Sequence, residues 1–355
     1  SLVKAIDQYN LFSSRLIMIG DNQYALQYCT DGARIHTMRN LEDTHDKYDI
    51  NDIRKMLVDV KTLPGEPLYA LTLIKTPDGA FVGIRCSHAT GDAFSIIFLC
   101  FIWKCAIEGT DFPPPSTQRL FTGKPVIFNQ VDKVFSPPVA ALNEKIQNRL
   151  KLTDVKIYSK NEYFTDEFFK DVKRQAKAEN EKYIISSHQI MTAFLLKKYH
   201  DKMLPHTDRI ILRNPINLRE AYPGLDPMYM GNAYFSSLTE FKKDELNKMS
   251  IPQIAFRLKE SINEARNPDY IKQKIYLSKY GIEFKPDIFE KYSPFNIETD
   301  ISAANLTQLS DPAAIGLDNS LVNILYMGST AQTSFIMLNQ KNTLFAQITS
   351  MYPLE

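Results

Sequence analysis

A histidine and an aspartate stand four residues apart in a polar segment between two strongly apolar stretches. The segment reads Ser-His-Ala-Thr-Gly-Asp over residues 87–92, so the pair is His88 and Asp92. An imidazole has a reference pKa of ~6.5, and His88 could therefore remove a proton from a hydroxyl or an amine near neutral pH. If the segment were helical, the spacing would place Asp92 beside His88 as an orienting carboxylate. The alternative is a loop histidine with satisfied hydrogen bonds and no chemical role.

The flanking segments predict a strand before His88 and a helix after Asp92. Residues 67–74 and 79–84 are rich in β-forming side chains, and Thr-Pro-Asp-Gly at 76–79 is typical of a turn between them. Residues 93–107 are apolar on almost every side, as in a helix that is buried on most faces. We therefore expect a β-hairpin that delivers His88 at the edge of a sheet.

The composition indicates a globular protein with a substantial core. Of the 355 residues 44% are hydrophobic, and 42 basic against 41 acidic residues give a net charge of +1. This balance gives no support for binding to nucleic acid or to an anionic membrane surface. Four cysteines without CxxC spacing predict reduced thiols, a cytoplasmic location and no zinc site. All apolar runs are shorter than the ~18 to 20 residues that span a bilayer.

Strands and helices follow one another without the regular alternation of a doubly wound sheet, which favours the α+β class. Residues 109–138 contain six prolines and few periodic apolar positions, which predicts a long crossover between an N-terminal lobe, 1–138, and a C-terminal lobe, 139–355. The expected helices are 2–12, 50–57, 93–107, 165–176, 186–197 and 251–266, and the expected strands are 15–19, 24–29, 34–38, 67–74, 79–84, 155–158, 208–213, 300–303, 322–326, 333–338 and 343–348.

Residues 88–93, His-Ala-Thr-Gly-Asp-Ala, resemble the HxxxDG motif shared by BAHD-type acyl-CoA acyltransferases, chloramphenicol acetyltransferase and the condensation domains of peptide synthetases. A pattern of this length recurs by chance, but further segments match in the expected order over roughly residues 5 to 350. They are the early hairpin at 28–35, a serine-capped helix at 183–193, a DxR segment at Asn217-Leu218-Arg219 and a GN(A) turn at Gly231-Asn232-Ala233.

The sequence departs from the family pattern at three places. Ala93 replaces the glycine of the motif, and Asn217 replaces the aspartate before Arg219. The family's DFGWG segment is represented only by Ala-Ile-Gly-Leu-Asp at 314–318. In plant members that segment is structural and lies away from the reacting atoms, so its loss indicates a distant, microbial branch and does not argue against catalysis.

The resemblance implies a two-lobed, chloramphenicol-acetyltransferase-like sandwich, in which each lobe is a mixed sheet flanked by helices and a tunnel runs between the lobes. It implies an enzyme of secondary metabolism that moves an acyl group from acyl-coenzyme A to a hydroxyl or amine of a small molecule. His88 would be the general base, and no metal or permanently bound cofactor is required because thiolate is a good leaving group. We expect a monomer whose coenzyme A side lies in the C-terminal lobe.

The same resemblance assigns roles to five further residues. Asp92 would turn away from the reacting atoms and pair with Arg219, which fixes the loop that carries His88. Ser186 and Ser187 would lie along the coenzyme A channel, although a plain helix cap is an equal alternative for one of them. Asn305 could donate a hydrogen bond to the tetrahedral oxyanion; Thr307 is a second candidate, and either could instead be a turn residue.

Two other functions stay open at this point. A stand-alone condensation-type domain would take its acyl donor from a carrier protein, and a non-catalytic binding protein would keep the fold alone. Release of coenzyme A from free acyl-CoAs favours the acyltransferase, whereas strict dependence on a carrier protein favours the condensation-type domain. Ligand binding without thiol release favours the third.

Overall fold

The computed structural model describes residues 12–20, 23–29, 34–60, 63–87, 90–112, 115–116, 156–272, 275, 298–309, 333–340 and 342–355. Contacts between Cα atoms divide the chain into two compact units, each built from separate stretches of sequence. Unit 1 comprises Ser1–Gln118, Asp226–Ala233 and Pro312–Asn323, and unit 2 comprises Arg119–Leu225, Tyr234–Asp311 and Ile324–Glu355. The predicted lobe boundary at residue 138 lies outside the described residues and stays a prediction.

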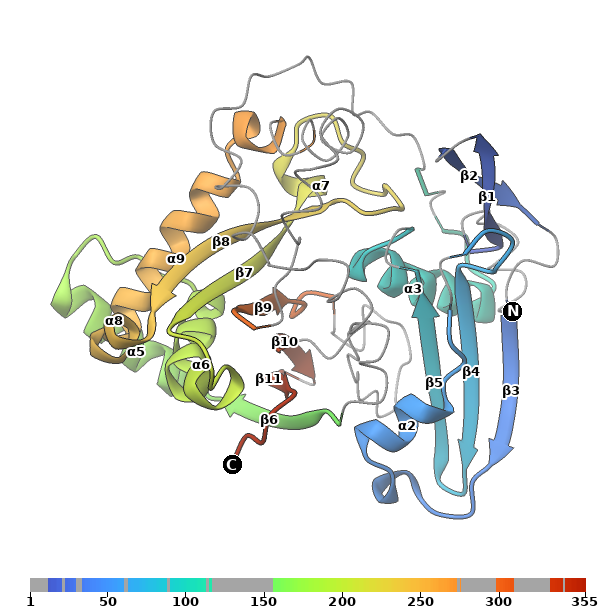
Figure 1. The fold of residues 1–355 in the computed structure, drawn as a ribbon, viewed down its shortest axis with the longest axis horizontal. Coiled ribbons are helices and arrows are strands. Elements are labelled where there is room, and N and C mark those ends of the chain that lie inside the picture. Colours follow the sequence, from blue (N-terminus) through green and yellow to red (C-terminus); the bar gives the residue numbers. More distant parts are fainter. Residues whose placement is uncertain are drawn as a thin grey trace. The chain divides into compact units, whose positions relative to one another are not determined.

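Unit 1 combines two small sheets with helices (Figure 1). One sheet is an antiparallel hairpin, and the other has three strands in the order β3-β4-β5, with β3 parallel to β4 and β5 antiparallel to it. The hairpins predicted at 15–29 and 67–84 and the edge position of β3 are confirmed. The described strands do not form the hairpin expected at 28–35, because β2 pairs with β1 and β3 pairs with β4. The described elements are β1 (Ser14–Gly20), β2 (Gln23–Tyr28), β3 (Arg34–Asn40), the 3-10 helix η1 (His45–Lys47), α2 (Ile50–Met56), β4 (Tyr69–Thr76), β5 (Gly79–Cys86) and α3 (Ala93–Glu108).

The core of unit 1 forms where α3 packs against the beginning of β4. Phe98, Leu99 and Ile102 of α3 are buried with Leu68 and Tyr69, and each such side chain contributes about 1.5–3 kcal/mol when it leaves water. The helix ends at Gly109, which adopts a left-handed φ of 71° and donates its N–H to the Cys105 carbonyl. The end of β5 and the start of α3 are thus both tied to one core.

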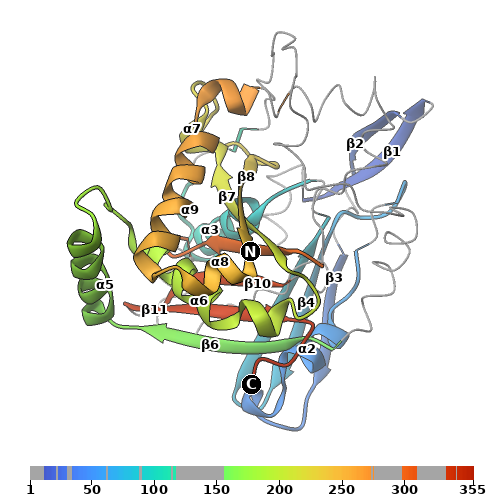
Figure 2. The same cartoon turned by 60° about the vertical axis from the view of Figure 1, so that its left-hand side comes forward.

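Unit 2 contains a six-stranded mixed sheet, in the order β6-β11-β10-β9-β7-β8, with helices packed against it (Figure 2). The pairs β7–β9 and β9–β10 are parallel, and the other neighbours are antiparallel. The described elements are β6 (Tyr158–Phe164), α5 (Asp166–Glu179), α6 (Ser187–Met203), β7 (Arg209–Asn217), α7 (Leu218–Ala221), β8 (Tyr234–Lys242), α8 (Lys243–Lys248), α9 (Ile251–Ala265), β9 (Asp300–Asn305), β10 (Ser334–Gln340) and β11 (Thr343–Ser350).

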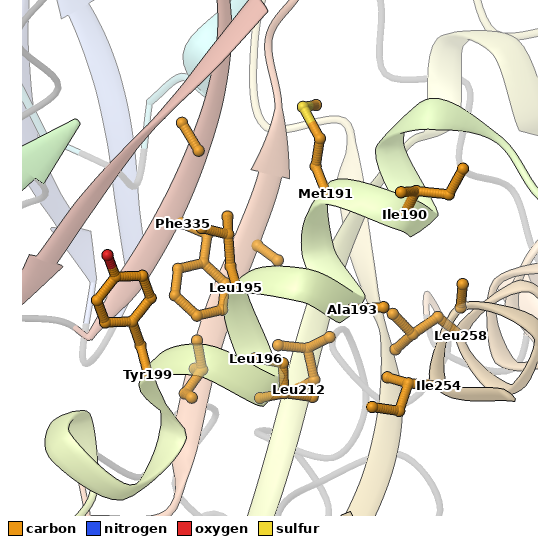
Figure 3. Packing of buried hydrophobic residues seen from close by; sticks show 14 of the residues in the cluster. Ile190, Met191, Ala193, Leu195, Leu196, Tyr199, Leu212, Ile254, Leu258 and Phe335 are labelled. Atoms are coloured by element: carbon orange, nitrogen blue, oxygen red, sulfur yellow. The ribbon is translucent and has the colours of Figure 1, made fainter. Parts of the chain in front are cut away.

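Helix α6 packs against both the sheet and α9, which explains why it is apolar on more than one side. Leu195 and Phe335 pack together on the sheet side, while Ala193 faces Ile254 and Leu258 of α9 (Figure 3). A mixed sheet covered by helices in this way confirms the predicted α+β class. Within the described ranges, no helix combines the length and the apolar character that crossing a bilayer requires.

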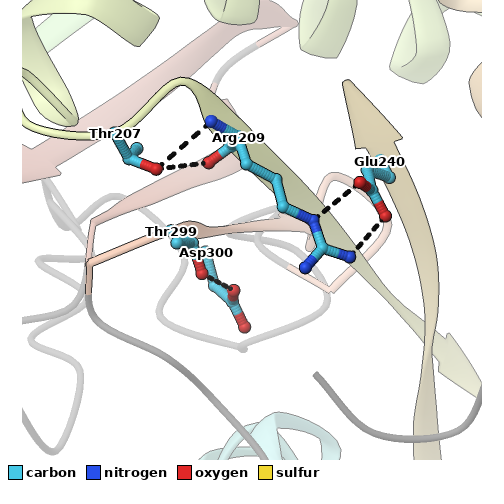
Figure 4. Close-up of polar contacts among 5 residues, drawn as sticks. All are labelled: Thr207, Arg209, Glu240, Thr299 and Asp300. Atoms are coloured by element: carbon cyan, nitrogen blue, oxygen red, sulfur yellow. Dashed lines mark hydrogen bonds and ion pairs between the residues drawn. The ribbon is translucent and has the colours of Figure 1, made fainter. Parts of the chain in front are cut away.

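Polar contacts reinforce the strand register near the start of β7. Arg209 forms a bidentate ion pair with Glu240 of β8 at 2.6 and 2.5 Å, and the Asp300 carboxylate accepts a hydrogen bond from Thr299 at 2.7 Å (Figure 4). Asp300 is fully buried and also pairs with Arg213 Nε at 2.6 Å. The Arg213–Asp300 pair joins β7 to β9, and breaking a buried pair of this kind costs about 3–5 kcal/mol.

Some element boundaries differ from the sequence prediction. The strand expected at 155–158 is wrong at Lys156 and Ile157, because β6 begins at Tyr158 and ends at Phe164. Its polar residues conceal it in the sequence, since an edge strand exposes much of its surface. Helix α6 ends at Met203, six residues beyond the predicted end at 197. The helix expected over 2–12, except Phe12, and the strand at 322–326 lie outside the described residues.

Candidate active site

The candidate site is the short connection between β5 and α3 in unit 1. β4 and β5 pair in register from Tyr69–Cys86 to Thr76–Gly79, so the hairpin holds the end of β5 firmly. Ser87 continues this pairing, because its N–H donates to the Leu68 carbonyl at 2.8 Å. His88 and Ala89 lie outside the described residues, and the structure therefore describes the residues on both sides of the candidate base.

Ser87 and Thr90, which flank the His88-Ala89 dipeptide, are joined by hydrogen bonds. The Thr90 N–H donates to the Ser87 carbonyl at 3.0 Å, and the Thr90 hydroxyl donates to the same carbonyl at 2.7 Å. Ser87 and Thr90 are 4% and 6% exposed, so both hydrogen bonds are shielded from water. A buried connection of this kind can hold a side chain in a narrow range of positions.

Asp92 is buried and is engaged through both carboxylate oxygens. Oδ1 accepts hydrogen bonds from the Ser95 N–H and the Ser95 hydroxyl, both at 3.2 Å, and so caps the N-terminus of α3. Oδ2 accepts the Ala233 N–H at 2.9 Å. Residues 90–92 are not helical, so the helical juxtaposition of Asp92 and His88 is not formed. Asp92 fastens the loop to α3 and to the Gly231-Asn232-Ala233 turn of the same unit.

Arg219 lies in α7 of unit 2 and is 7% exposed. Its Nη1 group donates to Asn217 Oδ1 at 3.3 Å, and the same oxygen accepts the Arg219 N–H at 3.2 Å. Asn217 therefore caps the short helix α7 in the position where the family has aspartate. Asp92 and Arg219 belong to different units, and their pairing stays a prediction.

Ser186 caps the N-terminus of α6. Its hydroxyl oxygen accepts the Gln189 N–H at 3.3 Å, and Gln189 Oε1 accepts the Ser186 N–H at 2.7 Å, which completes a capping box. Ser186 is exposed and Ser187, the first residue of α6, is partly exposed. The Ser186 hydroxyl keeps its own hydrogen, so a capping serine can still donate to a ligand oxygen.

Asn305 ends β9, and its side chain organises the following turn. Oδ1 accepts hydrogen bonds from the Thr307 N–H at 3.1 Å and from the Thr307 hydroxyl at 2.8 Å. This is the turn geometry that asparagine commonly forms. The hydroxyl hydrogen of Thr307 is used in this contact, whereas the amide nitrogen of Asn305 donates to no group within the described ranges.

Cys86, opposite Tyr69 on the hairpin, is a neutral thiol. Burial, and then the nearby Asp92 carboxylate, raise its pKa to about 11. It therefore lacks the thiolate that a nucleophilic cysteine needs at neutral pH. In the described part of the chain, no three His, Cys, Asp or Glu residues are grouped so that they could hold a metal ion.

Three contributors to this loop were missed in the sequence. Ser95 could have been found, because Asp-x-x-Ser before an apolar run is a local capping pattern. The contact from Ala233 spans 141 residues and has no local signal. Tyr69 is the single tyrosine in an otherwise aliphatic strand segment, and this placement of a polar hydroxyl in an apolar strand could have marked it as a candidate.

The fold agrees with comparisons to known proteins. The model of the transferase family matches residues 1–289. TRI101 of F. graminearum, complexed with coenzyme A and deoxynivalenol, superposes with a TM-score of 0.74 at 14% identity and covers 98% of this chain and 85% of that chain. TRI101 of F. sporotrichioides with coenzyme A and T-2 gives 0.72 at 13%, with 98% and 85% covered. Vinorine synthase gives 0.65 at 13%, with 99% and 81% covered.

A curated relative, acetyltransferase adrJ of Penicillium rubens, is 28% identical over 104 residues, which are 28% of this chain and 21% of that protein. The match thus spans about a fifth of the length of that relative. The structural neighbours confirm the predicted chloramphenicol-acetyltransferase-like α+β fold. Because the family model covers residues 1–289 of 355, this chain belongs to the transferase family of BAHD acyltransferases.

Proposed function

We propose that this protein transfers an acyl group from acyl-coenzyme A to a hydroxyl or amine of a small molecule, with His88 as the general base. The observation that carries the proposal is the HxxxD sequence at a strand-to-helix junction in a chain of this family, with its aspartate engaged through both carboxylate oxygens. Coenzyme A with deoxynivalenol or T-2 in the TRI101 structures supports a thioester donor and a small-molecule acceptor.

The reaction needs one proton acceptor and two oriented substrates. His88 takes the proton of the acceptor hydroxyl or amine while that oxygen or nitrogen forms a bond to the thioester carbonyl carbon. The tetrahedral oxyanion then collapses, the C–S bond breaks, and the coenzyme A thiolate takes the proton from the imidazolium. A positioned base contributes roughly 10² to 10⁴ in rate, and orientation and oxyanion stabilisation supply the rest.

The other predicted residues support this base or bind the substrates. Asp92 holds the loop through Ser95 and Ala233, and its pairing with Arg219 would add a further restraint. Ser186 and Ser187 would donate to oxygens of coenzyme A near the exposed N–H groups of α6, a position that favours anions. The Asn305 side-chain oxygen already accepts two hydrogen bonds from Thr307. The amide nitrogen of Asn305 would therefore be the group that donates to the oxyanion.

A panel of acyl-CoAs tests the proposal without knowledge of the pathway. Purified protein is incubated with each acyl-CoA and mixtures of small alcohols and amines, and free thiol and acylated product are measured. The wild type should release coenzyme A in step with product, and His88→Ala should lower turnover by roughly 10² to 10⁴ without a change in melting temperature. His206→Ala, which removes an exposed histidine of unit 2, is the matched control and should leave turnover unchanged. Full turnover by His88→Ala would refute the base assignment.

A second candidate is a condensation-type domain. The first condensation domain of the CDA synthetase matches with a TM-score of 0.53 at 10% identity, covering 98% of this chain and 80% of that chain. Product formation from a carrier-bound acyl group, with none from the same acyl-CoA, would favour this function. Thermal stabilisation by ligands without thiol release from any thioester would favour a binding protein.

The proposal also includes the setting in which the protein works. We expect a monomer that acts in the cytoplasm on secondary metabolites, without a permanently bound cofactor. Light scattering on the purified protein tests the monomer, and imaging of a tagged protein in its source cells tests the location.

A further inference from the structure

Tyr69 carries a buried hydroxyl that the core does not need. The side chain is 0% exposed and packs edge-to-face against Phe12, with 4.8 Å between ring centroids. Among the residues that the structure describes, no group lies in hydrogen-bond geometry with its hydroxyl. Phenylalanine would make the same apolar contacts without the loss of hydration that an unpaired buried hydroxyl suffers. Such a group in a folded protein requires an explanation.

The hydroxyl faces the connection between β5 and α3. A Cβ atom added to Gly91 would lie 3.0 Å from the Tyr69 oxygen and 2.9 Å from Ser95 Cβ, so the loop passes directly against the phenol. Burial raises the pKa of Tyr69, an interaction with Thr90 lowers it, and the nearby Cys86 and Asp92 raise it further. The phenol therefore stays protonated, and its O–H is a donor near Cys86, Thr90 and Asp92.

Thr90 is suited to accept this hydrogen. Its own hydroxyl hydrogen is given to the Ser87 carbonyl at 2.7 Å, which leaves the oxygen lone pairs available. Both groups belong to unit 1, and both are held on well-packed segments, β4 and the Ser87–Thr90 pair. Hydrogen bonds at active sites are often long in ligand-free proteins and shorten when substrates bind.

We propose that Tyr69 is a positioning residue: its hydroxyl donates to Thr90 Oγ1 and completes a Tyr69–Thr90–Ser87 chain, which fixes the residues that precede and follow the His88-Ala89 dipeptide. The inference rests on the proposed function, because it assigns a role at the same site. Tyr69 acts through Thr90 and contacts neither substrate. Its contribution is a narrower range of positions for the base.

A double-mutant cycle tests this chain. Tyr69→Phe and Thr90→Val each remove one hydroxyl with little change in shape, and kcat, KM for acyl-CoA and melting temperature are measured for both variants and for the double variant. We expect Tyr69→Phe to lower kcat about tenfold through lost positioning, with KM unchanged and melting temperature unchanged or raised. The double variant should be no slower than the slower single variant, because groups that act in one chain are non-additive. Thr90→Ser, which keeps the hydroxyl, should retain kcat within about twofold of the wild type.

Tyr199→Phe is the matched control. It removes another buried phenol hydroxyl, one that donates to Glu162 at 2.5 Å in unit 2, and should lower the melting temperature while kcat stays unchanged. A Tyr69→Phe variant with wild-type kcat, or with a kcat loss that multiplies with that of Thr90→Val, would overturn the proposal.

Hydrogen exchange gives a readout that needs no turnover. In the presence of coenzyme A, Tyr69→Phe should accelerate exchange in a peptide covering residues 84–95, because the Thr90 N–H loses a restraint. Unchanged exchange there would also overturn the positioning role. If the wild type transfers no acyl group while exchange changes as expected, the proposed function fails and the hydrogen-bonded chain stands.

Discussion

The beginnings of α3 and α6 are both capped by a side chain, but they differ in what the cap does. At α3 the capping group is the carboxylate of Asp92, 6% exposed, which also accepts the N–H of Ala233. At α6 the cap is the exposed hydroxyl of Ser186, which accepts the N–H of Gln189, three residues later, while the Gln189 side chain accepts the Ser186 N–H. The first helix start is therefore part of a buried network, and the second faces water.

This difference separates a structural helix terminus from one that is open to a ligand. A buried carboxylate that accepts three hydrogen bonds restrains the backbone around it. An exposed serine keeps a hydroxyl hydrogen to donate, beside N–H groups at the positive end of a helix. The geometry fits a division in which α3 holds the loop of the base and α6 meets the acyl donor, as proposed.

The largest expected effect comes from Asp92→Ala. It leaves the buried Ala233 N–H and Ser95 groups without their acceptor, and we expect the free energy of unfolding to fall by about 3–5 kcal/mol. Turnover should fall as well, because the loop of His88 loses its anchor. Urea denaturation and thiol release measure the two effects. A variant that melts like the wild type but has lost turnover would contradict the structural role of Asp92.

A pH effect on stability is expected at the start of α6. Burial, and then the positive charge of Arg266, lower the pKa of His188 to about 4. Unfolding returns the pKa of the imidazole to its ordinary value of 6.5. As the pH falls, the unfolded chain therefore takes up a proton at this histidine before the folded protein does. The resulting contribution of His188 to the free energy of unfolding, up to about 3 kcal/mol, is fully present above pH 6.5 and is lost as the pH falls towards 4. Urea melts between pH 4 and 7 measure it.

His188→Phe is the control for this pH dependence. The variant keeps an aromatic side chain at the site but cannot take up a proton, so its stability should fall less steeply over the same interval. An identical slope in the variant and the wild type would assign the pH dependence to other groups.

Ser186→Ala should have a smaller effect. Loss of the hydroxyl cap costs about 1 kcal/mol of stability, because the Gln189 N–H can turn to water. If the hydroxyl also donates to acyl-coenzyme A, KM for the donor should rise several-fold while kcat changes little. Ser187→Ala makes no change to the capping box and should leave the melting temperature unaltered. An unchanged KM in Ser186→Ala would show that Ser186 caps the helix and does not bind the donor.

The smallest effect is expected for Thr165→Ala. The Thr165 hydroxyl caps α5 through one hydrogen bond from the Phe168 N–H, at 3.3 Å on an exposed surface. Its removal should cost about 0.5–1 kcal/mol and leave turnover unchanged. Thermal melts and thiol release of this variant give the stability loss and the turnover expected when an ordinary, exposed helix cap is removed. A loss comparable with that of Asp92→Ala would erase the distinction between the buried and exposed helix starts.

The local features of the site could be predicted from sequence. The Thr-Pro-Asp-Gly turn, the strand pair around it and the start of α3 follow from patterns within a few residues, and so do the caps at Thr165 and Ser186. These depend on short-range hydrogen bonds and periodic burial, which adjacent residues determine.

The long-range features could not be predicted. Nothing near Asp92 specifies the Ala233 N–H as its partner, and nothing near Tyr69 shows that its hydroxyl faces Gly91. Both contacts arise only when separate segments pack. Most of β6 was missed for another reason. Its residues are polar and lie at the edge of the sheet, and they adopt strand geometry because they pair with β11.

The hydrogen bond between Asp92 and Ala233 has a consequence for how the protein is made. Its two partners are 141 residues apart, so this bond cannot form until Ala233 has left the ribosome. At about 5–20 residues per second, synthesis of the intervening chain takes roughly 7 to 30 s. During this interval the Asp92 carboxylate lacks the Ala233 N–H, its distant donor. Docking of the late segment is thus a candidate slow step in biogenesis, and translation speed across residues 93–233 would influence the yield of active protein.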